Sequence, residues 1–166
     1  MFISSLGDNP THDMIIVYMK LKVELEGRDL IEVECEGDDI SSADIKYPMK
    51  VLKVSMVGCT EFLDLMQSMR RHFGVDVSKW PLPEGKDHSS ILVREMVLKL
   101  RGEWKFPYEH KELCHCRTVD ASIVDQAIIS GAHTTEAVTR QTSASTACGT
   151  CRPEVQKIID FRLKAG

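Results

Sequence analysis

The chain has 166 residues, of which 43% are hydrophobic and 28% are charged, a composition typical of a folded globular protein. The formal net charge is −4, the pI is about 5.9 and no basic stripe is visible, so we do not expect nucleic acid as a partner. The longest apolar run, residues 14–19, is too short to cross a bilayer, and residues 1–13 lack the basic start and apolar stretch of a signal peptide. We therefore expect no membrane span and a cytoplasmic location.

The first third of the chain predicts an antiparallel sheet. Hydrophobic residues occupy every second position over residues 17–25, which is the pattern of a strand with one buried face. A turn at residues 27–29 precedes a second alternation over residues 31–36, which predicts the hairpin partner. A third strand is expected at residues 51–57. Cys35 lies on the apolar side of its strand, so we expect it in the core.

Helical spacing follows the third strand. A helix is expected to begin after Cys59, with Thr60 as its cap and Gly74 as its end. Residues 75–86 are interrupted by proline and glycine and predict a loop. The apolar spacing over residues 90–100 predicts a second helix.

These elements predict an N-terminal α+β domain, a sheet with helices, to which we assign residues 1–105. Residues 102–110 form a short linker whose aromatic residues are expected to pack at a domain boundary. These residues are Trp104, Phe106 and Tyr108.

The remaining residues, 110–166, predict a small all-α domain. Its first helix is expected over residues 120–130, and a short helix follows at residues 135–141. The last helix begins near Arg152, which precedes a proline that suits a first helical turn. The inward-facing residues of the first of these helices are expected to be Ile123, Ala127 and Ile128.

The chain has six cysteines but no recognisable secretion signal, and this combination argues against a disulfide framework. Four of them form two close pairs, Cys114-His115-Cys116 and Cys148-Gly149-Thr150-Cys151, with 31 residues between the pairs. Iron–sulfur clusters need thiolates that converge on a small volume, and each pair supplies two thiolates from one loop. Four thiolates also suit tetrahedral Zn²⁺, although zinc sites more often have Cys-x-x-Cys at both ends. The spacing favours a cluster on Cys114, Cys116, Cys148 and Cys151, with zinc as the rival.

The same cysteine pairs, together with Val119-Asp120 and Gly131 between them, resemble the small [2Fe–2S] domain of bacterioferritin-associated ferredoxin. They resemble even more the central domain of the nitrogen-fixation scaffold protein NifU. The resemblance covers residues 113–163. It implies a compact helical domain that holds a [2Fe–2S] cluster near the surface for one-electron redox chemistry.

A further resemblance lies upstream. Residues 83–90 are similar to the end of the U-type iron–sulfur scaffold domain, which precedes the ferredoxin-like domain in NifU. That family assembles clusters on three cysteines with an aspartate and a histidine nearby. This chain has His88-Ser89-Ser90 where the family has His-Cys-Ser, Cys59 is the counterpart of a second cysteine, and a first cysteine is missing. The resemblance therefore implies a degenerate assembly site.

The ordinary interpretations of the upstream residues are structural. Cys59 is expected to be a small buried side chain beside a helix start, and His88 a cap or surface histidine rather than a ligand. Asp13 lies in the region where the scaffold aspartate is expected.

Our leading hypothesis is a cluster-binding accessory protein that transfers one electron to or from a redox or iron–sulfur partner protein of unknown identity. The alternatives are a divergent assembly scaffold or carrier, and a redox-sensing binding module. Because no acid–base pair, nucleophile triad or phosphate-binding glycine loop is visible, we do not expect an enzyme. The sequence does not decide whether the chain forms a homo-oligomer.

Overall fold

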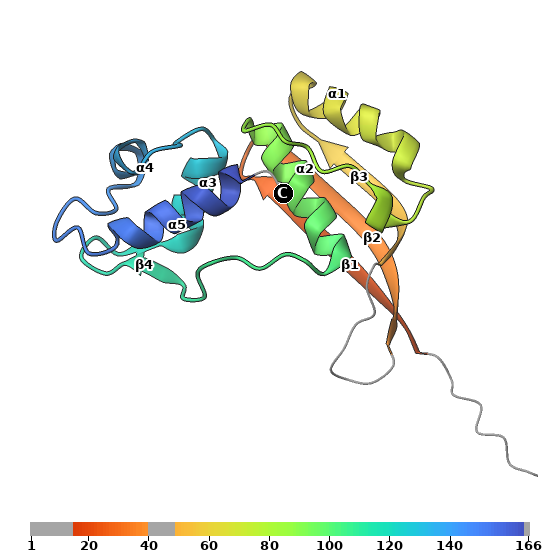
Figure 1. The fold of residues 1–166 in the computed structure, drawn as a ribbon, viewed down its shortest axis with the longest axis horizontal. Helices are drawn as coiled ribbons and strands as arrows, with labels where there is room; N and C mark the ends of the chain where they lie inside the picture. The colour runs from red at the N-terminus through yellow and green to blue at the C-terminus, as the bar shows by residue number, and fades with distance from the viewer. Residues whose placement is uncertain (1–14, 40–48, 165–166) are drawn as a thin grey trace, which may run out of the picture.

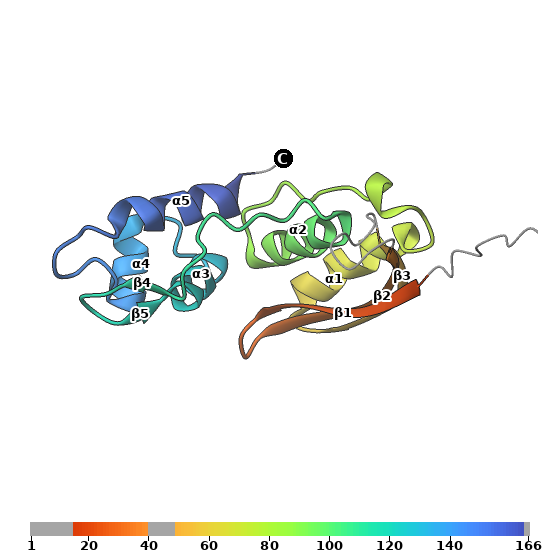
Figure 2. The ribbon, with the colours of Figure 1, turned by 90° about the horizontal axis from the view of Figure 1, so that it is seen from below.

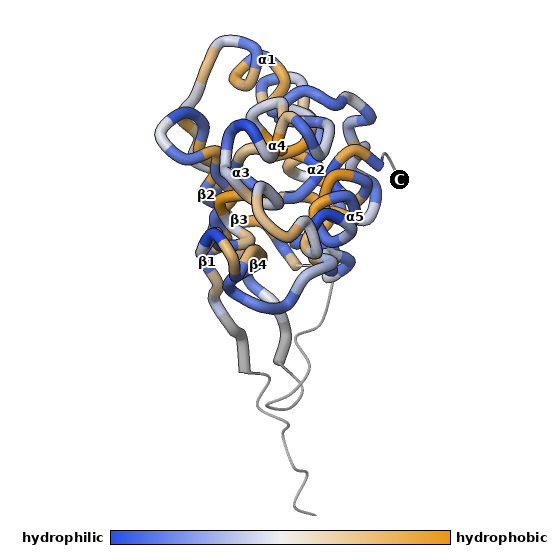
Figure 3. Tube along the Cα trace, turned by 90° about the vertical axis from the view of Figure 1, so that its left-hand side faces the viewer, coloured by the Kyte–Doolittle hydropathy of each residue, from blue (hydrophilic) through white to orange (hydrophobic). Residues whose placement is uncertain are grey.

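The computed structural model describes residues 15–39 and 49–164. These residues form two units side by side, a sheet unit (residues 15–39 and 49–101) and a cysteine unit (residues 111–164), as Figures 1 and 2 show. Hydrophobic and hydrophilic stretches are intermixed along the chain (Figure 3). Within the described ranges, no helix has both the length and the apolar character needed to cross a lipid bilayer. The architecture is mixed α and β.

Three antiparallel strands, paired in chain order, form the sheet: β1 (Ile15–Leu25), β2 (Asp29–Asp39) and β3 (Lys50–Val57). Gly27 makes the turn between β1 and β2 at φ +73°, a conformation that strains residues with a Cβ. The register places Val23 opposite Ile31, so both side chains face the same side of the sheet. Helices cover this side (Figure 2), and Cys35 is 1% exposed there, which confirms its predicted core position.

The helices of the sheet unit are α1 (Thr60–Met69) and α2 (His88–Arg101), with short 3-10 turns at Arg70–His72 and Val77–Lys79. Cys59, not Thr60, occupies the N-cap position of α1, and its backbone N–H donates to the Asp29 carboxylate at 2.8 Å. The predicted Thr60 cap is therefore wrong. Helix α2 begins earlier than expected because the Asp87 carboxylate accepts the N–H of Ser90 at 2.9 Å and caps the helix.

Large side chains fill the space between the sheet and its helices. Phe62 of α1 and both Leu92 and Met96 of α2 are fully buried. Trp80, in the segment expected to be a loop, is 1% exposed and donates its indole N–H to the Val75 carbonyl at 2.9 Å. The sheet unit therefore has a core of aromatic and long aliphatic side chains.

The cysteine unit contains β4 (Glu112–Cys114), β5 (Val119–Asp120), α3 (Ala121–Ile129), α4 (Thr135–Thr142) and α5 (Arg152–Leu163). The predicted all-α fold is incorrect for this unit because β4 and β5 pair as a small antiparallel hairpin. The Ala121 N–H also donates to the Lys111 carbonyl at 2.8 Å. Strands of two or three residues are too short for an alternating pattern to identify them in a sequence.

The inward face of α3 differs from the prediction at one position. Ala127 and Ile128 are buried as expected, but Ile123 is 50% exposed and Val124 is fully buried instead. Val124, Ala127 and Ile128 follow the i, i+3, i+4 spacing of one helical face, which leaves Ile123 at its edge.

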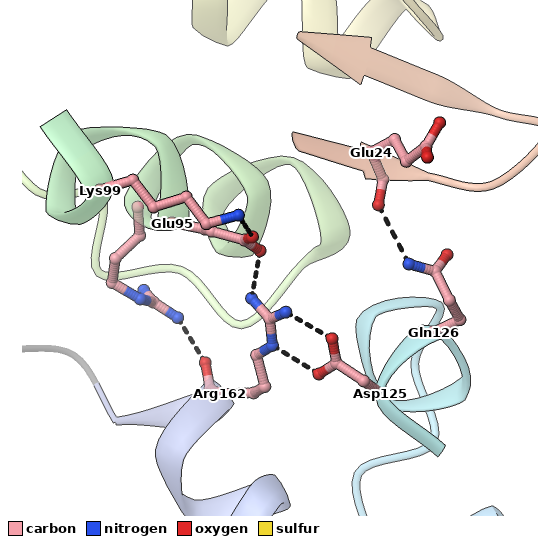
Figure 4. Close-up of polar contacts among 7 residues, drawn as sticks. Glu24, Glu95, Lys99, Asp125, Gln126 and Arg162 are labelled. Carbon is pink, nitrogen blue, oxygen red and sulfur yellow. Dashed lines mark hydrogen bonds and ion pairs between the residues drawn. The ribbon is translucent and has the colours of Figure 1, made fainter. Parts of the chain in front are cut away.

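Arg162, near the end of α5, joins the two units (Figure 4). Its guanidinium donates to Glu95 of α2 at 2.6 Å and to Asp125 of α3 at 2.5 and 2.7 Å, and the side chain is 4% exposed. Burial acts to lower the pKa of Arg162, but the hydrogen bonds and charges of Asp125 and Glu95 outweigh it and raise the pKa. Arg94 of α2 donates to the Arg162 carbonyl at 2.6 Å.

Aromatic and polar contacts extend this junction. Trp104, in the connecting segment, lies edge-on to Phe161 with ring centroids 4.9 Å apart, and the Arg162 guanidinium lies 4.7 Å from its ring centroid. The Gln126 amide donates to the Glu24 carbonyl of β1 at 3.1 Å (Figure 4). The Lys99 Nζ of α2 also lies 5.7 Å from the Trp104 ring centroid, so this aromatic residue of the connecting segment contacts both units.

Candidate metal centre

The four cysteines singled out by the sequence lie together at one end of the cysteine unit. A cavity of about 190 Å³ is lined by all four, and its wall is completed by Leu113, His115, Thr150 and Glu154. The Sγ atoms of Cys116 and Cys148 are 3.1 Å apart, although the residues are 32 positions apart in the chain. A hydrogen bond with the Cys151 side chain is also among the interactions that lower the pKa of Cys114. The fold therefore brings both pairs into one site.

Local backbone structure explains how each loop presents its pair. Cys114 ends β4, and Cys116 lies in the turn to β5, where Thr118 takes a left-handed conformation at φ +52°. Cys151 occupies the N-cap position of α5, whose first turn contains a proline. Gly149, inside the second pair, lies at φ +72°, which a glycine adopts without strain.

Each loop contributes one buried and one exposed thiol. Cys114 is 2% exposed and Cys151 is 9% exposed, whereas Cys116 and Cys148 are exposed to solvent. A group bound by all four thiols therefore lies at the surface, anchored on its inner side and accessible on its outer side.

Hydrogen bonds favour the thiolate form, which is the form that binds metal, at one thiol of each pair. The hydroxyl and backbone N–H of Thr150, followed by the Cys116 thiol, lower the pKa of Cys148 to about 7. Burial acts to raise the pKa of Cys114, but hydrogen bonds, the backbone N–H of Ser145 first among them, lower it overall. The pKa of Cys116 is raised, because its hydrogen bond to Cys148 and the charge of that residue both favour the thiol.

The donor set fits a [2Fe–2S] cluster in number and type, since such a cluster takes four cysteine thiolates. The helix dipole of α5 adds positive potential, because its N-terminus begins at the Cys151 cap. The two arginines that directly follow proposed ligand cysteines in the sequence are paired with other residues. The Arg117 guanidinium donates to the Thr146 hydroxyl at 2.7 Å. The exposed Arg152 guanidinium lies 4.0 Å from the Glu136 carboxylate.

Two hydroxyl groups outside the predicted ligand set contact the cysteines. The Thr150 hydroxyl lies 3.0 Å from the Cys148 Sγ, and the Ser145 hydroxyl lies 2.9 Å from the Cys151 Sγ. Thr150 lies inside the Cys-x-x-Cys motif, so its position could have been noticed. Ser145 lies outside both motifs, and only the folded loop reveals its contact.

A second group of metal-binding side chains lies in the sheet unit. Asp29 at the start of β2, Cys59 before α1 and His88 at the start of α2 have ligand atoms that all lie within 4.8 Å of one another. The His88 Nε2 is 3.2 Å from the Cys59 Sγ and 3.6 Å from the Asp29 Oδ2. That carboxylate oxygen is buried without a hydrogen-bond partner in the described part of the chain, with the Arg28 Nε 3.5 Å away.

This group corrects the structural interpretations of its members. His88 is neither a cap nor a surface residue, because Asp87 caps α2 and the His88 side chain is 10% exposed and contacts Cys59. Cys59 lies beside a helix start as expected, but it is only half-buried and its neighbours are polar. The aspartate of the group is Asp29, whereas Asp13, considered from the sequence, lies outside the described residues.

Comparison with known proteins finds a family model that matches the cysteine unit. Residues 113–160, less than a third of the chain, match the family model of the BFD-like [2Fe–2S] binding domain. Searches of curated proteins and of solved structures gave no match. These comparisons do not support the resemblance of the sheet unit to a U-type scaffold domain. The cofactor that this family match supports for the cysteine unit is a [2Fe–2S] cluster, as the sequence predicts.

Proposed function

We propose that this chain is an accessory protein for one-electron transfer, with its cluster held by Cys114, Cys116, Cys148 and Cys151. The observation that carries the proposal is the convergence of two buried and two exposed thiols on one surface cavity. When bound, a [2Fe–2S] cluster supplies a centre that gains and loses one electron. The electron is exchanged with a redox or iron–sulfur partner protein, and the chain itself turns over no substrate.

The parts of the chain have separate roles in this proposal. Cys114 and Cys151 anchor the buried side, and Cys116 and Cys148 form the edge that a partner protein approaches. The sheet unit acts as a docking module, fixed to the cysteine unit through Arg162. Free thiols at all six cysteines suit a reducing compartment, for which we propose the cytoplasm.

A potentiometric titration of the anaerobically purified protein tests this function. We expect one reversible one-electron transition of the visible spectrum, and an electron paramagnetic resonance signal that appears only on reduction. The matched control is Cys59→Ala, which removes a thiol outside the proposed ligand set and should leave the transition unchanged. A cluster that is present but takes up no electron reversibly would contradict the proposal.

We propose as a second candidate that the chain is a divergent cluster scaffold or carrier, and the Asp29, Cys59 and His88 group supports it. A carboxylate, a thiolate and an imidazole suit one Zn²⁺ or Fe²⁺ with an open fourth position. The neighbouring Ser89 hydroxyl, 3.1 Å from the His88 Nε2, is a poorer ligand than a thiolate. One thiolate is too few to hold a [2Fe–2S] cluster, so we favour electron transfer.

The second candidate is tested in the variant whose four C-terminal cysteines are alanine. Reconstitution of this variant with iron, sulfide and a cysteine desulfurase should yield no cluster that transfers to an apo-ferredoxin. If such a cluster forms, and if Cys59→Ala in the same background abolishes it, the scaffold function replaces electron transfer as the leading proposal. Cobalt(II) titration of the same two variants, read by thiolate-to-metal absorption, reports whether Cys59 binds a single metal ion.

A further inference from the structure

The loop that precedes the second cysteine pair has an unusual backbone. Ser143 and Ser145 both lie at φ +65°, in the left-handed region that is strained for residues with a Cβ. Glycine adopts this conformation without strain, yet the loop has serine at both positions. Backbone strain of this kind is stored where the surrounding structure and the function require it.

The two serines differ in what their side chains do. Ser143 is exposed and ends α4, and its backbone N–H donates to the Thr139 carbonyl at 2.9 Å. Ser145 is 9% exposed and its hydroxyl lies 2.9 Å from the Cys151 Sγ. A backbone hydrogen bond from Ser145 is also among the interactions that lower the pKa of Cys114. The side-chain contact of Ser145 is with Cys151.

The direction of the hydroxyl bond follows from the chemistry of the ligand. A cysteine that binds iron is a thiolate and has no proton to donate, so the Ser145 hydroxyl must donate to the Cys151 sulfur. The hydrogen bond lies away from solvent, where it is electrostatically stronger than at the surface. Thr150 makes the corresponding contact to Cys148 at 3.0 Å, but in an exposed position.

We propose that Ser145 is a positioning residue that raises the reduction potential of the cluster by hydrogen-bonding to the Cys151 thiolate. This inference rests on the proposed function and on the proposed ligand set. One electron from the reductant adds a negative charge that is shared with the ligand sulfurs, and no bond forms or breaks. Hydrogen bonds to those sulfurs stabilise the more negative, reduced state and are one of the factors that set the potential of such clusters.

Two substitutions separate the hydroxyl from the backbone strain. Ser145→Ala removes the hydroxyl and keeps the strain, whereas Ser145→Gly removes both. In each variant the ratio of reduced to oxidised protein at a fixed potential should fall by roughly threefold to tenfold, where tenfold corresponds to about 59 mV for one electron. Ser145→Gly should be at least as stable as Ser145→Ala.

Two matched controls complete the experiment. Ser143→Gly relieves the same strain beside the site without removing a sulfur contact, so its potential should equal that of the unmodified protein. Thr150→Val removes the exposed hydroxyl contact and should lower the potential by less than the Ser145 variants do. The potentials are measured by spectroelectrochemical titration of the purified full chain.

The outcomes distinguish this inference from the proposed function. Ser145 variants that keep their colour and their reversible one-electron transition, but with an unchanged potential, overturn the inference and leave electron transfer intact. Absence of a reversible transition in the unmodified protein overturns the proposed function itself. If the Ser145 variants lose the cluster, Ser145→Thr, which keeps a hydroxyl, decides the matter. A cluster restored by threonine with a potential near that of the unmodified protein supports the inference. A restored cluster whose ratio of reduced to oxidised protein at a fixed potential falls threefold or more, although threonine keeps the hydroxyl, contradicts it.

Discussion

The two units differ in what holds each of them together. The sheet unit buries large side chains, among them Phe62 and Trp80, between three strands and two helices. The core of the cysteine unit includes several alanines, and two of the proposed ligands, Cys114 and Cys151, are part of it. Burial of small side chains contributes less free energy than burial of large ones. We infer that the cluster supplies stability that the side chains of the cysteine unit do not.

The two thiol-containing sites also differ in the number of thiols that they bring together. The cysteine unit collects four thiols around one cavity, whereas the sheet unit places one thiol beside a histidine and an aspartate. The number of converging thiolates therefore separates a cluster site from a site suited to a single metal ion.

The largest effect is expected from removing the four proposed cluster ligands. Replacing Cys114, Cys116, Cys148 and Cys151 by alanine should abolish colour and acid-labile sulfide and unfold most of the cysteine unit. Amide hydrogen exchange should show protection lost over residues 113–160 and kept over the sheet unit. If the cysteine unit keeps its protection without the cluster, its own core is sufficient and the comparison of the two units fails.

The core of the sheet unit is tested by Phe62→Ala. Because Phe62 is fully buried, the free energy of unfolding of the sheet unit should fall by about 4 kcal/mol, while iron and sulfide per folded chain stay constant. Leu63→Ala, at the neighbouring 39% exposed position, is the control and should cost less than about 1 kcal/mol. Denaturant unfolding followed by tryptophan fluorescence measures both. A coupled loss of cluster would show that the units do not have separate cores.

The junction between the units is tested by Arg162→Met. The substitution leaves the Glu95 and Asp125 carboxylates without their buried partner, although Lys99 still pairs with Glu95 at 2.6 Å. We expect a loss of about 3 kcal/mol in the free energy of unfolding of the full chain. Arg140→Met, at an exposed position, is the matched control and should change little. Equal effects of the two substitutions would show that Arg162 does not join the units.

The smallest effect is expected from Cys59→Ala. Because Cys59 lies in the sheet unit, outside the proposed ligand set, the iron and sulfide content should stay unchanged within the error of the analysis. A clear loss of iron or sulfide would show that the sheet unit takes part in holding or assembling the cluster.

Local sequence patterns are sufficient to predict most of the strands and helices. Alternation and helical spacing identified the strands and helices, because each has one buried face that repeats with the period of its structure. The hairpin of β4 and β5 was missed, since its strands are too short to show a period. Ile123 was placed in the core because one helical turn does not fix which edge of an apolar stripe is buried.

In the two sites as well, contacts between residues close in sequence were predictable, and contacts between distant elements were not. The cysteine pairs were visible because each pair is close in sequence, and the fold needed only to bring two loops together. The contact of His88 with Cys59 and Asp29 depends on the positions of three separate elements, so sequence spacing could not reveal it. The contact of Ser145 with Cys151 depends on a left-handed backbone conformation at a residue other than glycine, which local sequence does not predict.

The central claim is that a [2Fe–2S] cluster, and no other metal, occupies the four-cysteine site. The most direct test is the iron, acid-labile sulfide and zinc content of anaerobically purified protein, measured together with its visible absorption spectrum. We predict a brown protein with about two irons and two sulfides per chain, which Cys59→Ala retains and the quadruple cysteine variant lacks. A colourless protein with one zinc per chain, lost in the quadruple variant, would contradict the account.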